Sequence, residues 1–283
     1  MVDQKLLTFL KLCETMNYHE TARLLNMTQP AVTQHIRALE DEYGCRFFIY
    51  DHRRLTKTKE AETLEAYARS AVFNEGRLKV SLGKSEMERF RIGATKSIGE
   101  YMIGEMVSSF LSDRGRTADI TIDNTEHLLG MLDKNLIDFA LIEGSFSKLK
   151  YGYRLFRNEP MTGICAVGHP FDGRCLSIED LFGETLILRE PGSGTRKILE
   201  RELQQCGYTV EAFHANVCIS SFKLIRHLVS EGCGVSFLYE AVVKDDTQFG
   251  RFSCPPLTGV HELNVVCLKH TDAPTLAHRF LDV

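Results

Sequence analysis

The sequence predicts a chain of two unlike parts: a small helical N-terminal domain with a short β-hairpin, and a larger α/β domain of two lobes. Three observations support this organisation. Residues 26–42 have the pattern of a capped amphipathic helix, and residues 58–83 keep helical spacing over a much longer stretch. From residue 89 onward, short apolar strands alternate with helices, which is typical of α/β folds with parallel strands.

The stretch 26–42 predicts a helix with defined ends. Thr28 can cap the free N–H groups of the first turn, Pro30 stands where no donor is needed, and Gly44 suits a left-handed C-cap. The apolar residues recur with the spacing of one buried stripe. They are Val32, Ile36 and Leu39.

The opposite face carries side chains that can reach base edges and phosphates in a DNA major groove. They are Thr28, Gln29, Pro30, Thr33, Gln34 and Arg37. On an isolated helix such a polar face is more often simply exposed to solvent. The neighbouring segments therefore decide between a solvated face and a DNA-binding one. A shorter helix at 20–25 comes first, and 47–56 predicts a hairpin with Arg53 and Arg54 near its tip. This order is that of a winged helix-turn-helix, with both arginines placed for phosphate or minor-groove contact.

About the first 70 residues resemble the winged helix-turn-helix domain of LysR-type transcriptional regulators. The matches are Leu7, Phe9, Leu10, Thr21, Ala22, Leu25, residues 28–33, Ile36, Leu39, Glu40, Gly44, Phe47, Phe48 and residues 53–56. Two departures fall at the wing: Tyr50 and Asp51 replace an expected basic residue, and Glu60-Ala61 replaces Ala-Gly. The resemblance implies a regulator that binds double-stranded DNA, and it admits contact with RNA polymerase.

The charge balance limits how DNA could be bound. The net charge of the 283 residues is -4, so binding has to come from a local basic patch. Its candidates are Arg37, Arg46, Arg53, Arg54 and Lys57. We find neither a membrane-length apolar run nor a secretory signal, and we therefore expect a cytoplasmic protein without a membrane partner.

An apolar stripe runs along the predicted linker helix after the wing. It consists of Leu64, Tyr67, Ala68, Ala71, Val72 and Leu78. The small N-terminal domain cannot bury the whole stripe. The resemblance implies a helix through which two chains pair antiparallel, giving a homodimer or homotetramer; the alternative is a helix packed on its own domain. The polar residues 81–88 predict a hinge.

The remaining elements fall into two series. We predict strands at 89–95, 118–124, 136–144, 161–167, 184–190, 234–240 and 262–270, and helices at 99–113, 125–135, 195–207, 220–232 and 273–281. In this order they resemble the effector-binding domain of the same family, which is periplasmic-binding-protein-like. The segments that carry the match are 136–141, 169–170 and 232–235, with crossovers between lobes near 158–161 and 259–263.

The resulting division has three parts: the DNA-binding domain is 1–58, the linker helix and hinge are 59–87, and the effector-binding domain is 88–283. Within the last, lobe I is 88–160 plus 263–283, and lobe II is 161–262.

The resemblance places an effector between the lobes, at strand ends and helix starts. The residues that it selects are Thr95, Lys96, Ser97, Thr125, Ser193, Gly194, Thr195 and Ser220. Hydroxyl groups, accessible backbone N–H groups and helix N-termini suit a small anion, either a carboxylate or an inorganic oxyanion. Each could instead be a plain helix cap. Closure of the cleft would change the spacing or bend that the bound DNA must accept.

Other classes of function find little support. The nine cysteines form no C-x-x-C pair, and we see neither a metal-ligand set nor a cofactor motif, so no metal or cofactor is expected. Cys206 and Cys218 could form a redox switch, as in peroxide-sensing members of the family. The rival functions are an α/β enzyme with an N-terminal dimerisation module, for which we find no catalytic constellation, and a solute-binding module, which would not need the winged helix.

Overall fold

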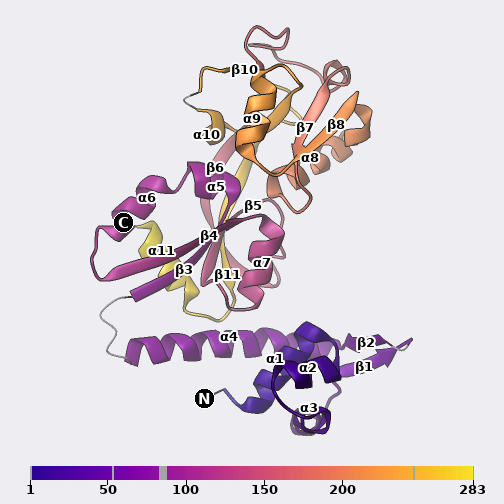
Figure 1. The fold of residues 1–283 in the computed structure, drawn as a ribbon, viewed down its shortest axis with the longest axis vertical. Helices are drawn as coiled ribbons and strands as arrows, with labels where there is room; N and C mark the ends of the chain where they lie inside the picture. The colour runs from indigo at the N-terminus through magenta and orange to yellow at the C-terminus, as the bar shows by residue number, and fades with distance from the viewer. Residues whose placement is uncertain (1, 53, 83–87, 245, 283) are drawn as a thin grey trace.

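The protein is described here from a computed structural model covering residues 2–52, 54–82, 88–244 and 246–282. A small N-terminal domain and one long helix lie beneath a larger domain, whose two lobes are stacked one above the other (Figure 1). The predicted hinge falls mainly on 83–87, outside the described residues.

The N-terminal domain has three helices and a hairpin. They are α1 (Gln4–Thr15), α2 (Tyr18–Leu24), α3 (Gln29–Tyr43), β1 (Phe48–Asp51) and β2 (Arg54–Lys57). Phe9, Leu12, Ile36 and Phe47 are among the side chains of its core. Helix α2 begins earlier than the sequence predicts, because the Asn17 side chain accepts a hydrogen bond from the Glu20 N–H and caps the helix at Tyr18.

Helix α4 (Lys59–Leu82) divides its apolar residues between two neighbours. Leu64 and Ala68 pack into the N-terminal core. These two residues of the predicted stripe therefore contact their own domain, which was the alternative to pairing with a second chain. Phe73 joins the core of the effector-binding half. The side chains of Tyr67 and Leu78 remain 63% and 55% exposed.

Hydrogen bonds fasten α4 to the larger domain. The Arg69 guanidinium donates to the Asp133 carbonyl and pairs with Glu65 at 2.6 Å. One residue further, the Ser70 hydroxyl donates to the Lys269 carbonyl at 2.6 Å. The orientation of the linker helix is thus tied to loops of the first lobe.

The first lobe is built on parallel strands. Its strands are β3 (Glu88–Thr95), β4 (Arg116–Asp123) and β5 (Phe139–Glu143), and its helices are α5 (Lys96–Tyr101), α6 (Gly104–Leu111), α7 (Thr125–Asp133) and α11 (Ala273–Leu281). Strand β3 is central and pairs in parallel with both β4 and β5. The single helix predicted at 99–113 is wrong: α5 and α6 are separate. The break allows Ile98 and Ile103, which would face different sides of one helix, to be buried together.

Two long strands join the lobes. Strand β6 (Tyr151–Ala166) pairs antiparallel with β11 (Val260–Leu268), from Pro160 opposite Val260 to Tyr151 opposite Leu268. Strand β11 also pairs with β5, while the far end of β6 pairs with strands of the second lobe. The sheet order is β10-β6-β11-β5-β3-β4, with β9 also on β6.

The second lobe contains the remaining elements. They are η1 (Glu179–Leu181), β7 (Thr185–Arg189), α8 (Gly194–Gln205), η2 (Val210–Ala212), β8 (Ala215–Ile219), α9 (Phe222–Ser230), β9 (Ser236–Tyr239), α10 (Glu240–Val243) and β10 (Phe249–Phe252). Strands β8 and β10 and helix α10 were not among the predicted elements. Strand β8 pairs in parallel with β7, and its residues are mostly exposed, so it lacks the apolar pattern of a buried strand.

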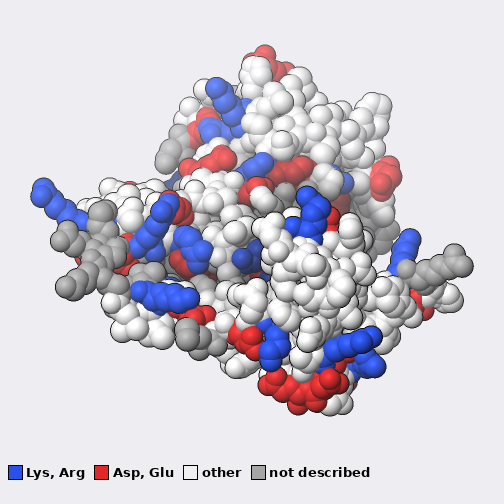
Figure 2. All heavy atoms as spheres, turned by 60° about the horizontal axis from the view of Figure 1, so that its bottom comes forward, with Lys and Arg blue, Asp and Glu red and all other residues white. Residues whose placement is uncertain are grey.

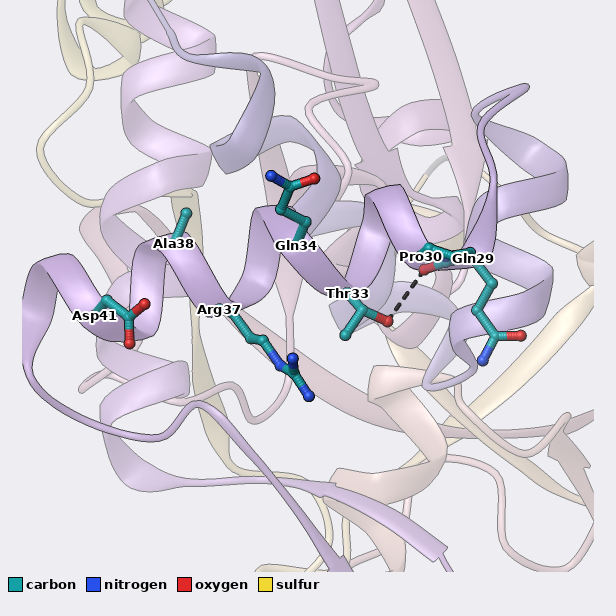
Figure 3. Close-up of a pocket in the computed structure, with 7 residues that line it drawn as sticks. All are labelled: Gln29, Pro30, Thr33, Gln34, Arg37, Ala38 and Asp41. Atoms are coloured by element: carbon teal, nitrogen blue, oxygen red, sulfur yellow. Dashed lines mark hydrogen bonds between the residues drawn. The ribbon is translucent and has the colours of Figure 1, made fainter.

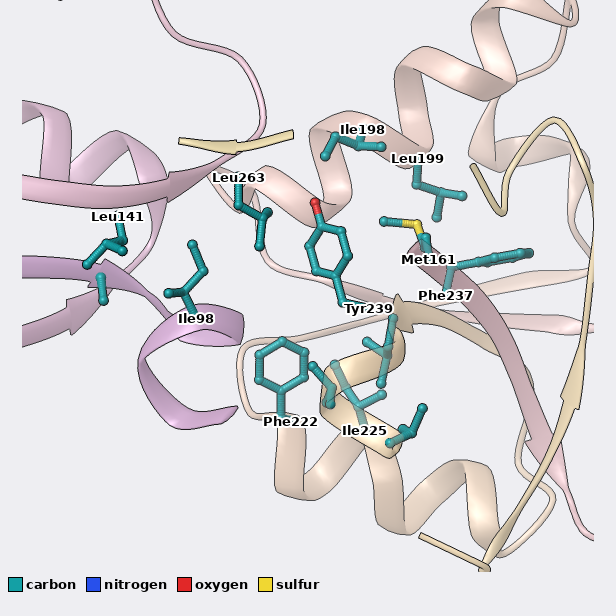
Figure 4. Packing of buried hydrophobic residues seen from close by; sticks show 14 of the residues in the cluster. Ile98, Leu141, Met161, Ile198, Leu199, Phe222, Ile225, Phe237, Tyr239 and Leu263 are labelled. Carbon is teal, nitrogen blue, oxygen red and sulfur yellow. The ribbon is translucent and has the colours of Figure 1, made fainter. Parts of the chain in front are cut away.

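A single apolar core runs through both lobes. Ile98 and Leu141 of the first lobe and Phe222, Ile225 and Tyr239 of the second belong to the same buried cluster (Figure 4). The lobes therefore meet directly.

We expect Arg69→Ala to lower the free energy of unfolding by about 1–3 kcal/mol, because it leaves the Asp133 carbonyl and part of Glu65 without their donor. Chemical denaturation measures the change. Arg23→Ala is the control: it removes an exposed pair with Glu20 and should cost under about 0.5 kcal/mol. Equal losses in the two variants would contradict a structural role for Arg69.

Candidate DNA interface and effector site

Helix α3 presents its polar face because its ends and its buried stripe fix its orientation. The Thr28 hydroxyl accepts a hydrogen bond from the Ala31 N–H at 3.3 Å, and Gly44 adopts a left-handed conformation at the other end. Val32, Ile36 and Leu39 are all buried, as predicted. The opposite side of the helix is consequently turned outward.

The outward side of α3 is a shallow concave surface (Figure 3). Its lining residues are Gln29, Pro30, Thr33, Gln34, Arg37, Ala38 and Asp41. The Thr33 hydroxyl donates to the Gln29 carbonyl at 3.0 Å, which leaves the two amides and Arg37 as the long polar side chains of the surface. The sequence analysis omitted Ala38 and Asp41, although their i+4 spacing from Gln34 and Arg37 places them on the same face.

The wing is an antiparallel hairpin, with Phe48 opposite Lys57 and Asp51 opposite Arg54. Arg54 is exposed, and Arg53 lies outside the described residues. Two other members of the predicted basic patch make ion pairs within the domain: Arg46 with Glu40, and Lys57 with Glu65, each at 2.7 Å. Basic and acidic side chains are interspersed over this end of the molecule (Figure 2), so any DNA attraction is local.

The predicted effector residues gather where the two lobes touch. Thr95 and Ser97 lie where β3 passes into α5, Thr125 begins α7, and Ser193 to Thr195 begin α8. The side chains of Thr95, Ser97, Thr125, Ser193 and Thr195 are all buried. The structure thus brings hydroxyl groups of both lobes together.

The centre of this group is Glu143, which the sequence analysis did not select. It ends β5 and is only 1% exposed. The Thr195 hydroxyl, from the other lobe, donates to Glu143 Oε1 at 3.0 Å, and the Thr125 hydroxyl donates to the Glu143 carbonyl at 3.0 Å. An acidic residue directly after a strongly apolar strand was the signal that could have found it.

Glycine is required where the lobes meet. A Cβ atom placed on Gly194 would lie 2.5 Å from both Cγ and the carbonyl oxygen of Glu143. Gly144 has a φ of 82°, and a Cβ there would lie 2.9 Å from Gly194 Cα. The chain of one lobe therefore touches the start of α8 in the other.

Lys96 and Ser220 form a second contact between the lobes. Lys96 Nζ donates to the Ser220 carbonyl at 2.8 Å and pairs with Glu190 at 3.3 Å. Ser220 is exposed and takes part through its backbone. Lys96 is thus engaged by groups of the second lobe.

Several buried polar atoms around Glu143 have no hydrogen-bond partner among the described residues. They are Thr95 Oγ1, Ser97 Oγ, Glu143 Oε2, Arg189 Nη1, Ser193 Oγ and Tyr239 OH. Buried polar groups are nearly always satisfied in proteins, so each calls for a bound molecule or water. Such a concentration at one junction is the strongest sign of a ligand site in the larger domain.

The charges at the junction are unequally compensated. Arg189 is stacked on Phe222 at 4.2 Å and gives Nε and Nη2 to Glu190, at 2.8 and 3.0 Å. Burial acts to raise the pKa of Glu190, but the contacts with Arg189 outweigh it and the pKa is lowered. Burial raises the pKa of Glu143 even though Ser97, Arg189 and Thr195 oppose the shift. Glu143 is thus the carboxyl group without an adequate counter-charge.

Comparison with known families decides what this architecture is. Residues 4–62 match the model of the bacterial regulatory helix-turn-helix proteins of the lysR family, and residues 83–283 match that of the LysR substrate binding domain. The chain belongs to the LysR family. It is therefore a DNA-binding transcriptional regulator with an effector-binding domain, and not an enzyme.

Individual LysR-family proteins are similar over most of their length. The regulator CbbR of Rhodospirillum rubrum is 29% identical, over 83% of this chain and 78% of its own. A hydrogen-peroxide-bound OxyR mutant of Corynebacterium glutamicum aligns with a TM-score of 0.63 at 20% identity, covering 98% of this chain and 89% of its own. The regulatory domain of Synechocystis CcmR, in complex with 2-PG, aligns with a TM-score of 0.60 at 17% identity. The alignment covers 69% of this chain and 96% of the CcmR chain.

The other candidate features of the sequence concern metal binding, membrane insertion and the thiol groups. Among the described residues, no group of three or more His, Cys, Asp or Glu side chains could hold a metal ion. Across the same ranges, every helix is too short or too polar to span a bilayer. All nine cysteines are free thiols, and Cys206 and Cys218 are both exposed. The Arg196 guanidinium lies 3.5 Å from Cys218 Sγ, a cationic neighbour that the sequence analysis missed.

Gln34→Ala and Arg37→Ala should each weaken binding to a specific DNA site by about 1–3 kcal/mol and leave the fold intact, because both side chains are exposed on the outer face of α3. Affinities are measured on an operator selected from randomised DNA and on random DNA. Unchanged discrimination in both variants would refute the assignment of this face.

Glu143→Gln should make the ligand-free chain more stable at neutral pH but not in acid. The folded-state pKa of Glu143 lies above its ordinary 4.5, so the stability of the natural chain falls as pH rises from 4.5 through the folded-state value. Gln does not titrate, so the stability of the Glu143→Gln variant relative to the natural chain should increase as the pH rises from 4.5 through the folded-state pKa of Glu143. Denaturation curves at several pH values test this; a pH-independent difference would contradict it.

Proposed function

We propose that this LysR-family regulator is controlled by a small effector with an anionic group, bound between the lobes of its effector-binding domain. The observation that carries the proposal is the set of buried, unpartnered polar atoms contributed by both lobes, including Thr95 Oγ1 and Ser193 Oγ. A ligand there would contact the two lobes at once. It would thereby act on their relative position.

An anionic group has suitable partners at the junction. Arg189 Nη1 is buried and unpartnered, and a guanidinium is a strong donor to carboxylate and phosphate oxygens. The Ser193 hydroxyl, directly before α8, is buried and makes no capping bond. Thr95 and Ser97, at the start of α5, offer further buried hydroxyl groups.

The DNA-binding half of the proposal rests on the face of α3 and on the wing. Thr28, Gln29, Pro30, Thr33, Gln34, Arg37, Arg53 and Arg54 are the residues that we propose for DNA contact. A homodimer or homotetramer would present two such faces about one helical turn apart on the DNA. The exposed side chains of Tyr67 and Leu78 on α4 are candidates for contact with a second copy of the chain. For the DNA-bound form we also propose contact with RNA polymerase.

Control would follow from the connection between the lobes and α4. An effector shifts an equilibrium only through its different affinity for two arrangements. Here β6 and β11 pass from one lobe to the other, and α4 is attached to the first lobe through Arg69 and Ser70. A change at the junction could therefore alter how α4 presents the DNA-binding domain.

Thermal denaturation of the full chain with a panel of small carboxylates, oxyanions and metabolites tests the effector site. A ligand at a hundred times its dissociation constant should add about 2.7 kcal/mol. Thr95→Ala and Ser193→Ala should each weaken the effect, because both hydroxyl groups are buried at the junction. Ser112→Ala, which removes an exposed hydroxyl, is the matched control. A ligand whose effect survives both junction variants would place the site elsewhere.

A further inference from the structure

We propose that the effector is a small zwitterion, a carboxylate that also carries an ammonium group, and that Glu143 is the residue that selects it. The inference rests on the proposed effector site between the lobes and specifies the chemistry of its ligand. It concerns a residue that lies in the first lobe but reaches the start of a helix in the second.

The place where a simple anion would be expected is already filled. The carboxyl group of Glu143 lies at the N-terminus of α8: its Oε1 accepts from the Thr195 hydroxyl at 3.0 Å, and its Cγ lies 2.5 Å from where a Cβ on Gly194 would be. The helix N-terminus therefore already faces a negative group supplied by the chain itself. A second anion in the same place would be repelled.

Glu143 itself lacks a partner of the opposite charge. Among the described residues it makes no ion pair, and its second oxygen, Oε2, is buried without a hydrogen bond of good geometry, although the Ser97 hydroxyl lies close enough to act to lower the pKa of Glu143. A buried carboxylate is costly unless it is both paired and hydrogen-bonded, and when ionised it can only accept. An ammonium group supplies both the donor and the charge.

The other charged groups at the junction are used up in pairs. Arg189 gives two of its nitrogens to Glu190, and Lys96 also pairs with Glu190. What remains are two buried atoms without a hydrogen bond of good geometry, Glu143 Oε2 and Arg189 Nη1. These two atoms are complementary to the ammonium and carboxylate groups of one small molecule.

The neighbouring hydroxyl groups complete the polar lining. Ser193 is buried and unpartnered, Ser97 is buried close to Glu143, and each hydroxyl can donate or accept. Burial, with the charges of Glu143 and Glu159, raises the pKa of Tyr239 well above its ordinary value, so its hydroxyl remains a donor. The Tyr239 hydroxyl points between the lobes (Figure 4). The lining is thus polar at one end of an otherwise apolar junction.

The test uses the full chain and sets of carboxylates that differ at one position only. The sets are acetate, glycolate and glycine; propionate, lactate and alanine; and succinate, malate and aspartate, with inorganic phosphate and sulfate added. Thermal shift identifies binders, and calorimetry gives their affinities. In at least one set we expect the amino member to bind tenfold or more tighter than its hydrogen and hydroxyl counterparts, a difference of about 1.4 kcal/mol.

Glu143→Gln should abolish that preference, since it keeps the shape of the side chain but removes the charge. Asp138→Asn is the matched control. Asp138 is equally buried, next to the other end of β5, and its pair is with Arg91, so its loss should affect stability but leave the preference unchanged. Loss of the preference in both variants would show that any buried carboxylate matters and would overturn the role of Glu143.

The remaining outcomes separate this inference from the proposed function. If no amino member binds, or if bare carboxylates, hydroxy acids or phosphate bind at least as tightly, the inference is wrong. If Glu143→Gln tightens binding of those anions, Glu143 is an internal competitor for an anionic effector. In either case, loss of ligand binding in Thr95→Ala and Ser193→Ala would still support the proposed effector site between the lobes. An amino-acid ligand that survives both of these variants would overturn the inference and the site together.

Discussion

The pairing of β6 with β11 is the constraint on which the effector-binding domain depends. Each strand belongs to the sheet of the first lobe, and β6 continues into the second, so both lobes are anchored to one antiparallel ladder. A ladder of backbone hydrogen bonds resists sliding because a change of register would turn buried side chains outward. Because the ladder holds both lobes, a ligand bound between their facing surfaces, as proposed, would act on two parts that are already joined.

Glu143 gives that junction its character. The apolar cluster around Tyr239 draws the lobes together, but a buried carboxyl group lies within it and is incompletely neutralised. Such a group stores an unfavourable interaction in the ligand-free protein. A molecule that satisfies it would therefore stabilise the closed arrangement, and the free energy released on binding becomes available to shift the position of the lobes.

Helix α4 connects this junction to the DNA-binding domain by being part of both cores. Leu64 and Ala68 pack with the N-terminal helices, whereas Phe73 packs with the first lobe. Between them Arg69 holds Glu65 of its own helix and the Asp133 carbonyl at the end of α7. A displacement of the first lobe cannot leave α4 in place without breaking these contacts, so the helix is suited to carry a change from the junction to α3.

The sequence by itself determined the capped helix α3 with its buried stripe and the order of strands and helices, because these depend on local spacing and capping. The LysR-type architecture and the candidate effector residues Thr95, Thr125 and Ser193 to Thr195 came from the resemblance of the sequence to that family. Only the tertiary structure revealed the break between α5 and α6, the division of α4 between two cores, and the edge strand β8, which has no apolar pattern. It alone placed Glu143 against α8, because that contact joins residues far apart in the chain, and burial by the opposite lobe, which no local pattern records, gives the carboxyl group its unusual chemistry.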